Sequence, residues 1–332
     1  MITADSVVEN GSRHFGRFAR TPREANPADE FRGVRRLFED WRTKEWAGFT
    51  LGHPELFSSM IVQDAKYLAS SEMYVFDRAT GSLSQWAGSM SPRRLTLPAD
   101  ILRSRVRFAD EKKGHRIGYD FADERIVITI EIAAQAEGPA VTGRLELDPS
   151  RASAPLVVSS RLPGGGRMYT NKIVFPASGS LRVGGREYAF DPARDFAILD
   201  EHKSHLPYRT RWVWGTFALP HDGGFLGANF AHRPHTPGEE EESAIWTPTG
   251  VEPLSDITFT PQGEDRLSPW RIRSADGRLD VTFSPQGRKD VNVNFVVAAL
   301  RYFQMYGTYT GTVNGIDIGT VGGVCEDFAA RL

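Results

Sequence analysis

Acids, imidazoles and arginines gather in one short stretch of the sequence, at the end of an apolar run. Phe196–Leu199 is followed directly by Asp200, Glu201 and His202, and His205 comes three residues later. Side chains alternate between the two faces of a strand, so Asp200 and His202 share one face and Glu201 lies on the other. A carboxyl group near an apolar pocket tends to stay protonated and can act as a general acid. We therefore predict that Asp200 is a catalytic acid or base and that His202 is its partner.

Polar and aromatic residues on both sides of this stretch complete the predicted site. Tyr208 and Arg209 follow a few residues after His205, and we predict that they orient a substrate. The residues predicted to bind the substrate are polar or aromatic residues of the surrounding strands: Tyr169, Asn171, Glu201, His205, Trp212, Trp214 and Asn229. Two other interpretations stay open. The acids could form a structural ion-pair network with Arg209 and Arg211, and the aromatic residues could be ordinary core.

The same histidines could in principle hold a metal ion. Imidazole is a common metal ligand, and His202 and His205 can converge with Asp200 on one face. No second group of ligands accompanies them, and the single cysteine, Cys325, excludes a cysteine-rich zinc site. The glycines at 164–166 lack the spacing of a dinucleotide-binding loop, and no P-loop is present. We predict neither a metal nor a cofactor.

Composition narrows the class of protein and its partners. The 332 residues carry a formal net charge of -2, with 40% hydrophobic and 25% charged residues, as in ordinary globular proteins. No basic surface argues for nucleic acid, and no apolar run approaches the ~18 residues of a membrane span. A lone cysteine and the lack of a signal-type apolar core favour the cytoplasm. The expected partner is a hydrophobic small molecule, and the sequence leaves a homodimer open.

Most of the chain has the pattern of short strands separated by turns. Runs such as Arg125–Ala133 are rich in β-branched residues, which favour pleated and half-buried surfaces. Two similar segments, Asp256–Gly263 and Asp280–Gly287, are interpreted as two strand ends of one sheet, and Asn314–Gly315 indicates a hairpin turn. Apolar residues at helical spacing predict one helix over Asp29–Trp46. The fold class is therefore mainly β with little helix.

The pattern divides the chain into an N-terminal part and two β-rich halves. Residues 1–45 are predicted to be an extended arm and a short helix, with the arm in solvent. Residues 46–165 and 166–332 would each form an antiparallel barrel or sandwich domain. Four consecutive acids, Glu239–Glu242, repel one another and are expected to stay in water. Cys325 is expected to be a small buried residue.

The residues from Tyr169 onward resemble a known pattern. They include Pro176, Gly179–Leu181, the acidic Asp200–His202 motif and the Trp212–Trp214 strand. This order is similar to that of the hydroxyneurosporene synthase (carotenoid hydratase) superfamily with its AttH-like proteins, and within it to the domain of unknown function 2804 family. The resemblance covers roughly residues 40–330 and includes the late segment YGTYTGTVNGIDI. The chain departs from the pattern after the acidic motif, where Lys203 replaces a tryptophan.

The resemblance implies two lipocalin-like antiparallel barrels and a pocket between or within them. Members of the superfamily include a hydratase of isoprenoid double bonds and cyclases that act on polyenes. It implies a cofactor-free enzyme of lyase, hydratase, isomerase or cyclase type. The substrate would be an isoprenoid, polyketide or lipid held in a barrel cavity. The alternative is a carrier for a hydrophobic ligand, since barrels of this size hold ligands readily. A weaker third alternative is a structural protein without a cavity.

Overall fold

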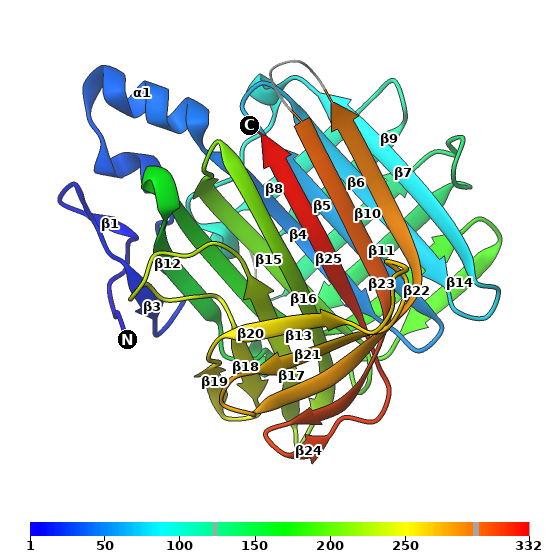
Figure 1. Cartoon of the computed structure of the whole chain (residues 1–332). Coiled ribbons are helices and arrows are strands. Elements are labelled where there is room, and N and C mark those ends of the chain that lie inside the picture. Colours follow the sequence, from blue (N-terminus) through cyan, green and yellow to red (C-terminus); the bar gives the residue numbers. More distant parts are fainter. Residues whose placement is uncertain (122–124, 295–298, 332) are drawn as a thin grey trace. The chain divides into compact units, whose positions relative to one another are not determined.

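Antiparallel strands make up most of the chain, as expected from the sequence (Figure 1). The structure is a computed structural model that describes residues 1–121, 125–294 and 299–331. The chain divides into two compact units. The first comprises residues 1–159 and 168–205, and the second comprises residues 160–167 and 206–332. Residues 168–205, which the sequence analysis counted with the second half, thus pack with the first unit.

A curled antiparallel sheet forms the first unit and closes almost into a barrel. In spatial order its strands are β7 (Ser82–Met90), β6 (Ala69–Asp77), β5 (Leu56–Asp64), β4 (Lys44–Gly52), β15 (Phe196–His205), β13 (Gly166–Val183), β11 (Val141–Leu147), β10 (Ile126–Ile132), β9 (His115–Asp120) and β8 (Arg105–Asp110). The end strands β7 and β8 contact each other, and the Ser89 backbone N–H donates to Asp110. Three further strands extend this sheet. β12 (Leu156–Leu162) and β14 (Arg186–Phe190) pair with β13, and β3 (Gly16–Phe18) pairs with β12.

The second unit has its own curled sheet, which forms a half-barrel. In spatial order its strands are β19 (Gly250–Pro253), β18 (Ala244–Thr247), β17 (Gly224–His232), β16 (Arg209–His221), β25 (Val321–Arg331), β23 (Ala299–Val313), β22 (Leu279–Asn294), β21 (Trp270–Ser274) and β20 (Ile257–Pro261), with β24 (Ile316–Asp317) beside β23. The two similar segments of the sequence lie in β20 and β22 of this one sheet, as predicted. Only β20 ends at its proline, because β22 continues through Pro285 and Gly287, where its register shifts, to Asn294.

Alternation of apolar and polar residues explains how these strands bury one face. In β10, Ile126, Ile128, Ile130 and Ile132 point into the first core, while the residues between them are more exposed. The hairpin predicted at Asn314–Gly315 is confirmed. Both residues have positive φ, at 49° and 76°, as a tight turn between twisted strands requires.

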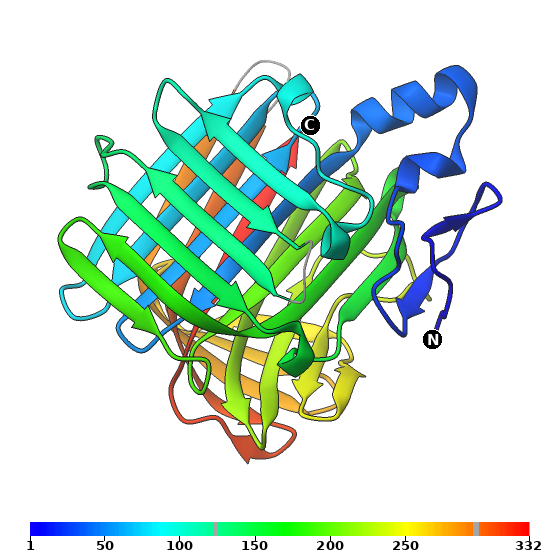
Figure 2. The ribbon, with the colours of Figure 1, turned by 180° about the vertical axis from the view of Figure 1, so that it is seen from behind.

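The N-terminal arm packs on the protein, so the prediction that it lies in solvent is wrong. It contains β1 (Val8–Glu9), β2 (Ser12–Arg13) and β3, which pairs with β12 (Figure 2). Val7 and Phe18 are buried in a small core with Val157 and Tyr169. Arg13 is also buried and donates to Ser159 Oγ and to the Met168 carbonyl. The arm's apolar side chains were missed because arginines separate them in the sequence.

The helix and the acidic loop also differ in part from expectation. Helix α1 spans Gly33–Arg42, inside the predicted range, and follows a 3-10 turn at Pro27–Glu30. Further 3-10 turns cover Pro92–Arg94, Ile101–Arg103, Pro149–Arg151 and Pro163–Gly165. In the run of four acids, Glu242 is buried rather than hydrated because Arg233 donates to it at 2.8 Å. Cys325 is buried, as predicted.

Candidate functional site

One end of the first barrel has a polar interior. Ala197 and Leu199 of β15 point into the hydrophobic core, and alternation places Glu201 and Lys203 on the same face. On the neighbouring strand β13, Asn171 likewise continues the face of the core residues Ile173 and Phe175. Both strands thus contribute apolar side chains to the core along part of their length and polar side chains at this end of the barrel.

Glu201 is the central group of this polar interior. Its side chain is 1% exposed, and its Oε2 accepts a hydrogen bond of 3.0 Å from Asn171 Nδ2. Its Oε1 is buried and has no hydrogen-bond partner among the described residues. Burial raises the pKa of the Glu201 carboxyl to about 7, although the positive charge of Lys203 opposes the change. The group can therefore exist in both protonation states near neutral pH.

Tyr169 and Asn171 approach Glu201 from β13. The Tyr169 hydroxyl is buried, and no hydrogen-bond partner for it lies in the part of the chain that the structure describes. Burial, and then the negative charge of Glu201, raise the pKa of this phenol well above its usual value, so it stays protonated. Asn171 is fixed at both ends of its amide, because its Oδ1 accepts from Thr21 of the N-terminal arm at 3.2 Å. Glu201 Oε1 and the Tyr169 hydroxyl are thus two buried polar atoms of this interior for which the described residues provide no hydrogen-bond partner.

Two segments cover this end of the barrel. Lys203 Nζ donates to the Pro98 carbonyl at 2.6 Å, in the connection between β7 and β8. That connection buries Leu97 and Ile101 in the first core. The N-terminal arm joins it through the Ala25 N–H, which donates to the Ala99 carbonyl at 2.9 Å. Among the described residues, these two segments therefore lie over the polar end of the barrel.

Asp200 and His202 share the opposite face of β15, as alternation predicts. Asp200 Oδ1 accepts a hydrogen bond of 2.6 Å from Lys172 Nζ, and the lysine is almost fully buried. The cation that pairs with Asp200 is therefore Lys172 of β13. The two arginines that the sequence offers as partners, Arg209 and Arg211, belong to the other unit.

The ring of His202 is held by its neighbours. It stacks on Trp46 with the ring centroids 4.2 Å apart, and its Nδ1 lies 2.7 Å from Ser204 Oγ.

His205 instead contacts helix α1. The His205 Nε2 atom lies 2.5 Å from the Glu39 carbonyl oxygen, and the His205 Nδ1 atom lies 3.2 Å from the Glu39 carboxylate. Burial lowers the pKa of His205, and the contacts with Glu39 oppose this change.

The remaining predicted site residues belong to the second unit. Tyr208 and Arg209 are exposed at the start of β16. Trp212 Nε1 donates to Glu326 Oε1 at 2.7 Å, and its ring stacks on Phe328. Glu326 also accepts from Gln304 at 3.0 Å.

Trp214 and Asn229 form a second buried pair in this unit. Trp214 Nε1 donates to Asn229 Oδ1 at 2.8 Å. The Asn229 amide in turn donates to the Glu242 carbonyl at 2.9 Å. The predicted residues thus separate into two groups. Tyr169, Asn171, the acidic motif and His205 lie in the first unit, and the rest lie in the second.

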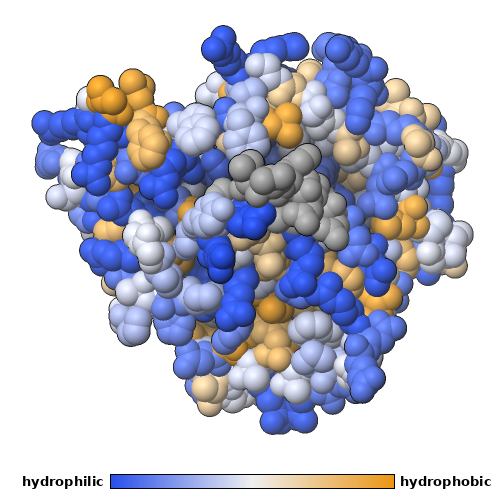
Figure 3. Space-filling view, turned by 45° about the horizontal axis from the view of Figure 1, so that its top comes forward, coloured by the Kyte–Doolittle hydropathy of each residue, from blue (hydrophilic) through white to orange (hydrophobic). Residues whose placement is uncertain are grey.

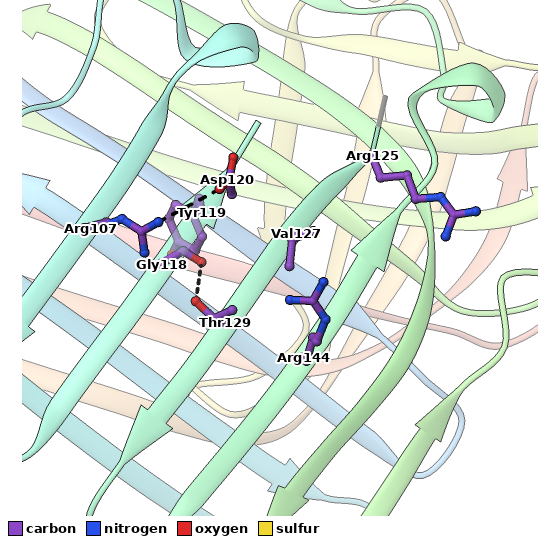
Figure 4. A pocket seen from close by; sticks show the side chains of 8 residues that line it. All are labelled: Arg107, Gly118, Tyr119, Asp120, Arg125, Val127, Thr129 and Arg144. Carbon is purple, nitrogen blue, oxygen red and sulfur yellow. Dashed lines mark hydrogen bonds and ion pairs between the residues drawn. The ribbon is translucent and has the colours of Figure 1, made fainter. Parts of the chain in front are cut away.

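A surface hollow of about 270 Å³ lies elsewhere on the first unit, on the outer face of β8 to β11 (Figure 4). Arg107, Gly118, Thr129 and Arg144 form one row across these four strands. The glycine leaves a gap between the two arginines. The lining is polar and includes none of the predicted site residues, so this hollow is no cavity for a hydrophobic ligand.

Metal ions and membranes are two further partners to which the described residues can be compared. Among residues 1–121, 125–294 and 299–331, no three His, Cys, Asp or Glu side chains are grouped so that they could hold a metal ion. Within the same ranges, no helix has the length and apolar character needed to cross a membrane.

Sequence reasoning missed the two buried lysines of the site. Lys172 interrupts an apolar run, Ile173–Phe175, and a lysine in such a strand requires a counter-charge. That signal could have indicated Asp200 as its partner. Lys203 was noted only as a departure from a family pattern. No sequence pattern indicated Thr21 or Pro98, because their contacts with Asn171 and Lys203 form only when distant segments fold over the end of the barrel.

A family model for a domain of unknown function, DUF2804, matches residues 14–332. The chain belongs to the DUF2804 family. A search of curated proteins by sequence finds no match. The fold of this DUF2804 chain is similar to that of a protein described as AttH from Nitrosomonas europaea, with 16% identity, a TM-score of 0.57, and coverage of 92% of this chain and 95% of the other.

Two further solved structures are more distant from the DUF2804 chain. Kievitone hydratase from Nectria haematococca has 12% identity and a TM-score of 0.46, and CghA has 10% identity and a TM-score of 0.48. Each comparison covers 87% of this chain and 88% of the other. At these identities the likeness concerns the fold.

Proposed function

We propose that this protein is an enzyme that acts by acid–base chemistry on a hydrophobic small molecule, in a reaction of hydratase, lyase, isomerase or cyclase type. The observation that carries the proposal is the Glu201 carboxyl, which is fully buried, has one unpartnered oxygen and has its pKa raised to about 7. A general acid or base is most effective when its pKa lies near the working pH. Glu201 meets that condition.

The roles of the neighbouring residues follow from their contacts. Protonated Glu201 would donate its proton from Oε1 to an alkene or enol carbon of the substrate and become a carboxylate. Asn171 holds Oε2 and so fixes the direction of the carboxyl group. The Tyr169 hydroxyl, which stays protonated, can donate a hydrogen bond to a substrate oxygen or to a water molecule that adds to the double bond. Lys203 stabilises the carboxylate after proton transfer.

Asp200 and His202 have a different role in this proposal from the one that the sequence suggested. Asp200 is already bound to Lys172 and His202 to Trp46 and Ser204, all on the opposite face of β15. We assign them to positioning the strand that carries Glu201. The apolar core next to Glu201 favours a substrate with little polarity, because a polar one would lose hydration without replacement.

Identification of a substrate by mass spectrometry of the small molecules that co-purify, followed by a turnover assay, tests the proposal. Glu201→Gln keeps the shape and the bond from Asn171 but cannot transfer a proton, and we expect a loss of ~10²-fold or more in rate. Asp200→Asn on the other face is the control, with a far smaller loss expected. A folded Glu201→Gln variant with full turnover would overturn the assignment. Bound ligand without turnover by the wild type would indicate a carrier instead.

A further inference from the structure

Helix α1 points its apolar face into solvent. Val34, Leu37, Phe38 and Trp41 recur at the spacing of one helical face, and they are 83%, 73%, 57% and 55% exposed. Glu39 is the buried residue of the helix. Figure 3 shows apolar side chains of α1 at the upper left, among charged ones. A helix packed in the usual way would have buried this stripe.

The orientation of the helix is fixed by specific contacts. His205 at the end of β15 binds both the carbonyl and the carboxylate of Glu39. Thr43, just after the helix, also donates to the Glu39 carbonyl at 2.9 Å. These contacts hold the polar side of α1 against the barrel. Because the Glu39 side of the helix contacts His205, the opposite, apolar side faces solvent.

A neighbouring turn extends the exposed apolar surface. Tyr67 and Leu68, between β5 and β6, are 62% and 44% exposed. Lys44 lies between the two segments, with its Nζ 5.6 Å from the Trp41 ring and 5.4 Å from the Tyr67 ring. We name the four apolar residues of α1 together with Tyr67 and Leu68 the α1 patch.

Cations border the α1 patch on one side, where the guanidinium groups of Arg35 and Arg42 also lie 3.8 Å from the Glu39 carboxylate. The Arg42 guanidinium lies 5.8 Å from the Phe38 ring, and Lys44 lies between Trp41 and Tyr67 as described. Arg35 is on the same side of the helix as Arg42, while Asp40 is an acid on the other side. Aromatic and aliphatic side chains bordered by arginine and lysine are typical of helices that lie at the surface of an anionic membrane.

We propose that the α1 patch docks the protein reversibly on the surface of an anionic phospholipid bilayer. The apolar side chains would enter the boundary between headgroups and acyl chains, and Arg42 and Lys44 would contact the phosphates. A second copy of this chain is the alternative occupant, and a dimer in light scattering would reveal it. Docking would place an enzyme for apolar molecules where such molecules are dissolved.

Co-sedimentation of the full chain with vesicles tests the proposal. We expect binding to vesicles of phosphatidylglycerol and phosphatidylcholine, weaker binding to phosphatidylcholine alone, and weaker binding at high salt. Leu37→Ser/Phe38→Ser/Trp41→Ser should weaken binding by ~10-fold or more. Ile316→Ser, at an exposed apolar residue of β24, is the matched control and should bind as the wild type does.

Three results would overturn the proposal. They are absence of wild-type binding to the anionic vesicles, equal binding by the triple variant, and a dimer in light scattering that the triple substitution abolishes while vesicle binding is absent. All three substituted side chains are exposed, so the variants should fold, which circular dichroism can verify.

Discussion

Glu201 and His115 are buried titratable residues of the first unit whose pKa values move in opposite directions. Burial raises the pKa of Glu201 from 4.5 to about 7 and lowers the pKa of His115 from 6.5 to about 4. Both changes favour the neutral form. The stability that Glu201 contributes is present below its unfolded pKa and is lost as pH rises through about 7. For His115 it is present above 6.5 and is lost as pH falls through about 4.

Because these two contributions oppose each other, a difference between variants isolates Glu201. Relative to Glu201→Gln, which does not titrate, the wild type should lose about 3 kcal/mol of unfolding free energy between about pH 4.5 and about pH 8. The measurement is urea unfolding of both proteins across that range. A difference that stays flat with pH would mean that the Glu201 carboxyl titrates normally, and the proposed acid–base role would lose its support.

The candidate site was only partly predictable at the scale of residues. Alternation predicted that Glu201 and Asp200 lie on opposite faces of one strand, and the structure confirms this. It could not show which face is the interior, because Phe196–Leu199 is apolar on both faces. In the structure Lys172 pairs with Asp200, whereas Glu201 is buried on the inner face beside Asn171, which the N-terminal arm contacts. Those contacts arise from segments distant in the sequence.

At the scale of elements, glycines permit close packing in the second sheet. A Cβ at Gly323 of β25 would lie 2.6 Å from the Tyr309 ring, and the Tyr309 hydroxyl donates to the Val324 carbonyl. We expect Gly323→Ala to lower the unfolding free energy by about 1–3 kcal/mol, the usual range for overpacking. Gly250→Ala is the control, because nothing lies within 4 Å of the position that its Cβ would take, and it should change stability by less than ~0.5 kcal/mol. Equal stability of the two variants in urea unfolding would contradict this explanation.

The type of each element was more predictable than its orientation. The strands around Arg125–Ala133 and the turn at Asn314 were evident because alternation and turn residues are local signals. The helix at Gly33–Arg42 was evident for the same reason. Its apolar periodicity would ordinarily indicate a buried face, but the anchor between His205 and Glu39 reverses this, and that contact joins residues 166 positions apart.

At the scale of the whole molecule, each unit closes its own hydrophobic core. Members of the first core lie between Ala47 and Leu199, and members of the second lie between Phe217 and Cys325. The sequence predicted two β-rich halves from repeated hairpins. It could not predict that β13 and β15 complete the first sheet, since the pairing of β15 with β4 joins strands about 150 residues apart in sequence, a non-local contact that no local pattern encodes.

Separate cores predict separate unfolding transitions. Gly52 of β4 faces Phe196 of β15, and a Cβ there would lie 2.2 Å from the Phe196 ring, so Gly52→Ala should destabilise the first unit. Gly323→Ala should destabilise the second unit. In scanning calorimetry we expect two transitions, with each substitution lowering the midpoint of one by several degrees and leaving the other nearly unchanged. A single transition that both substitutions lower equally would mean that the chain unfolds as one cooperative unit.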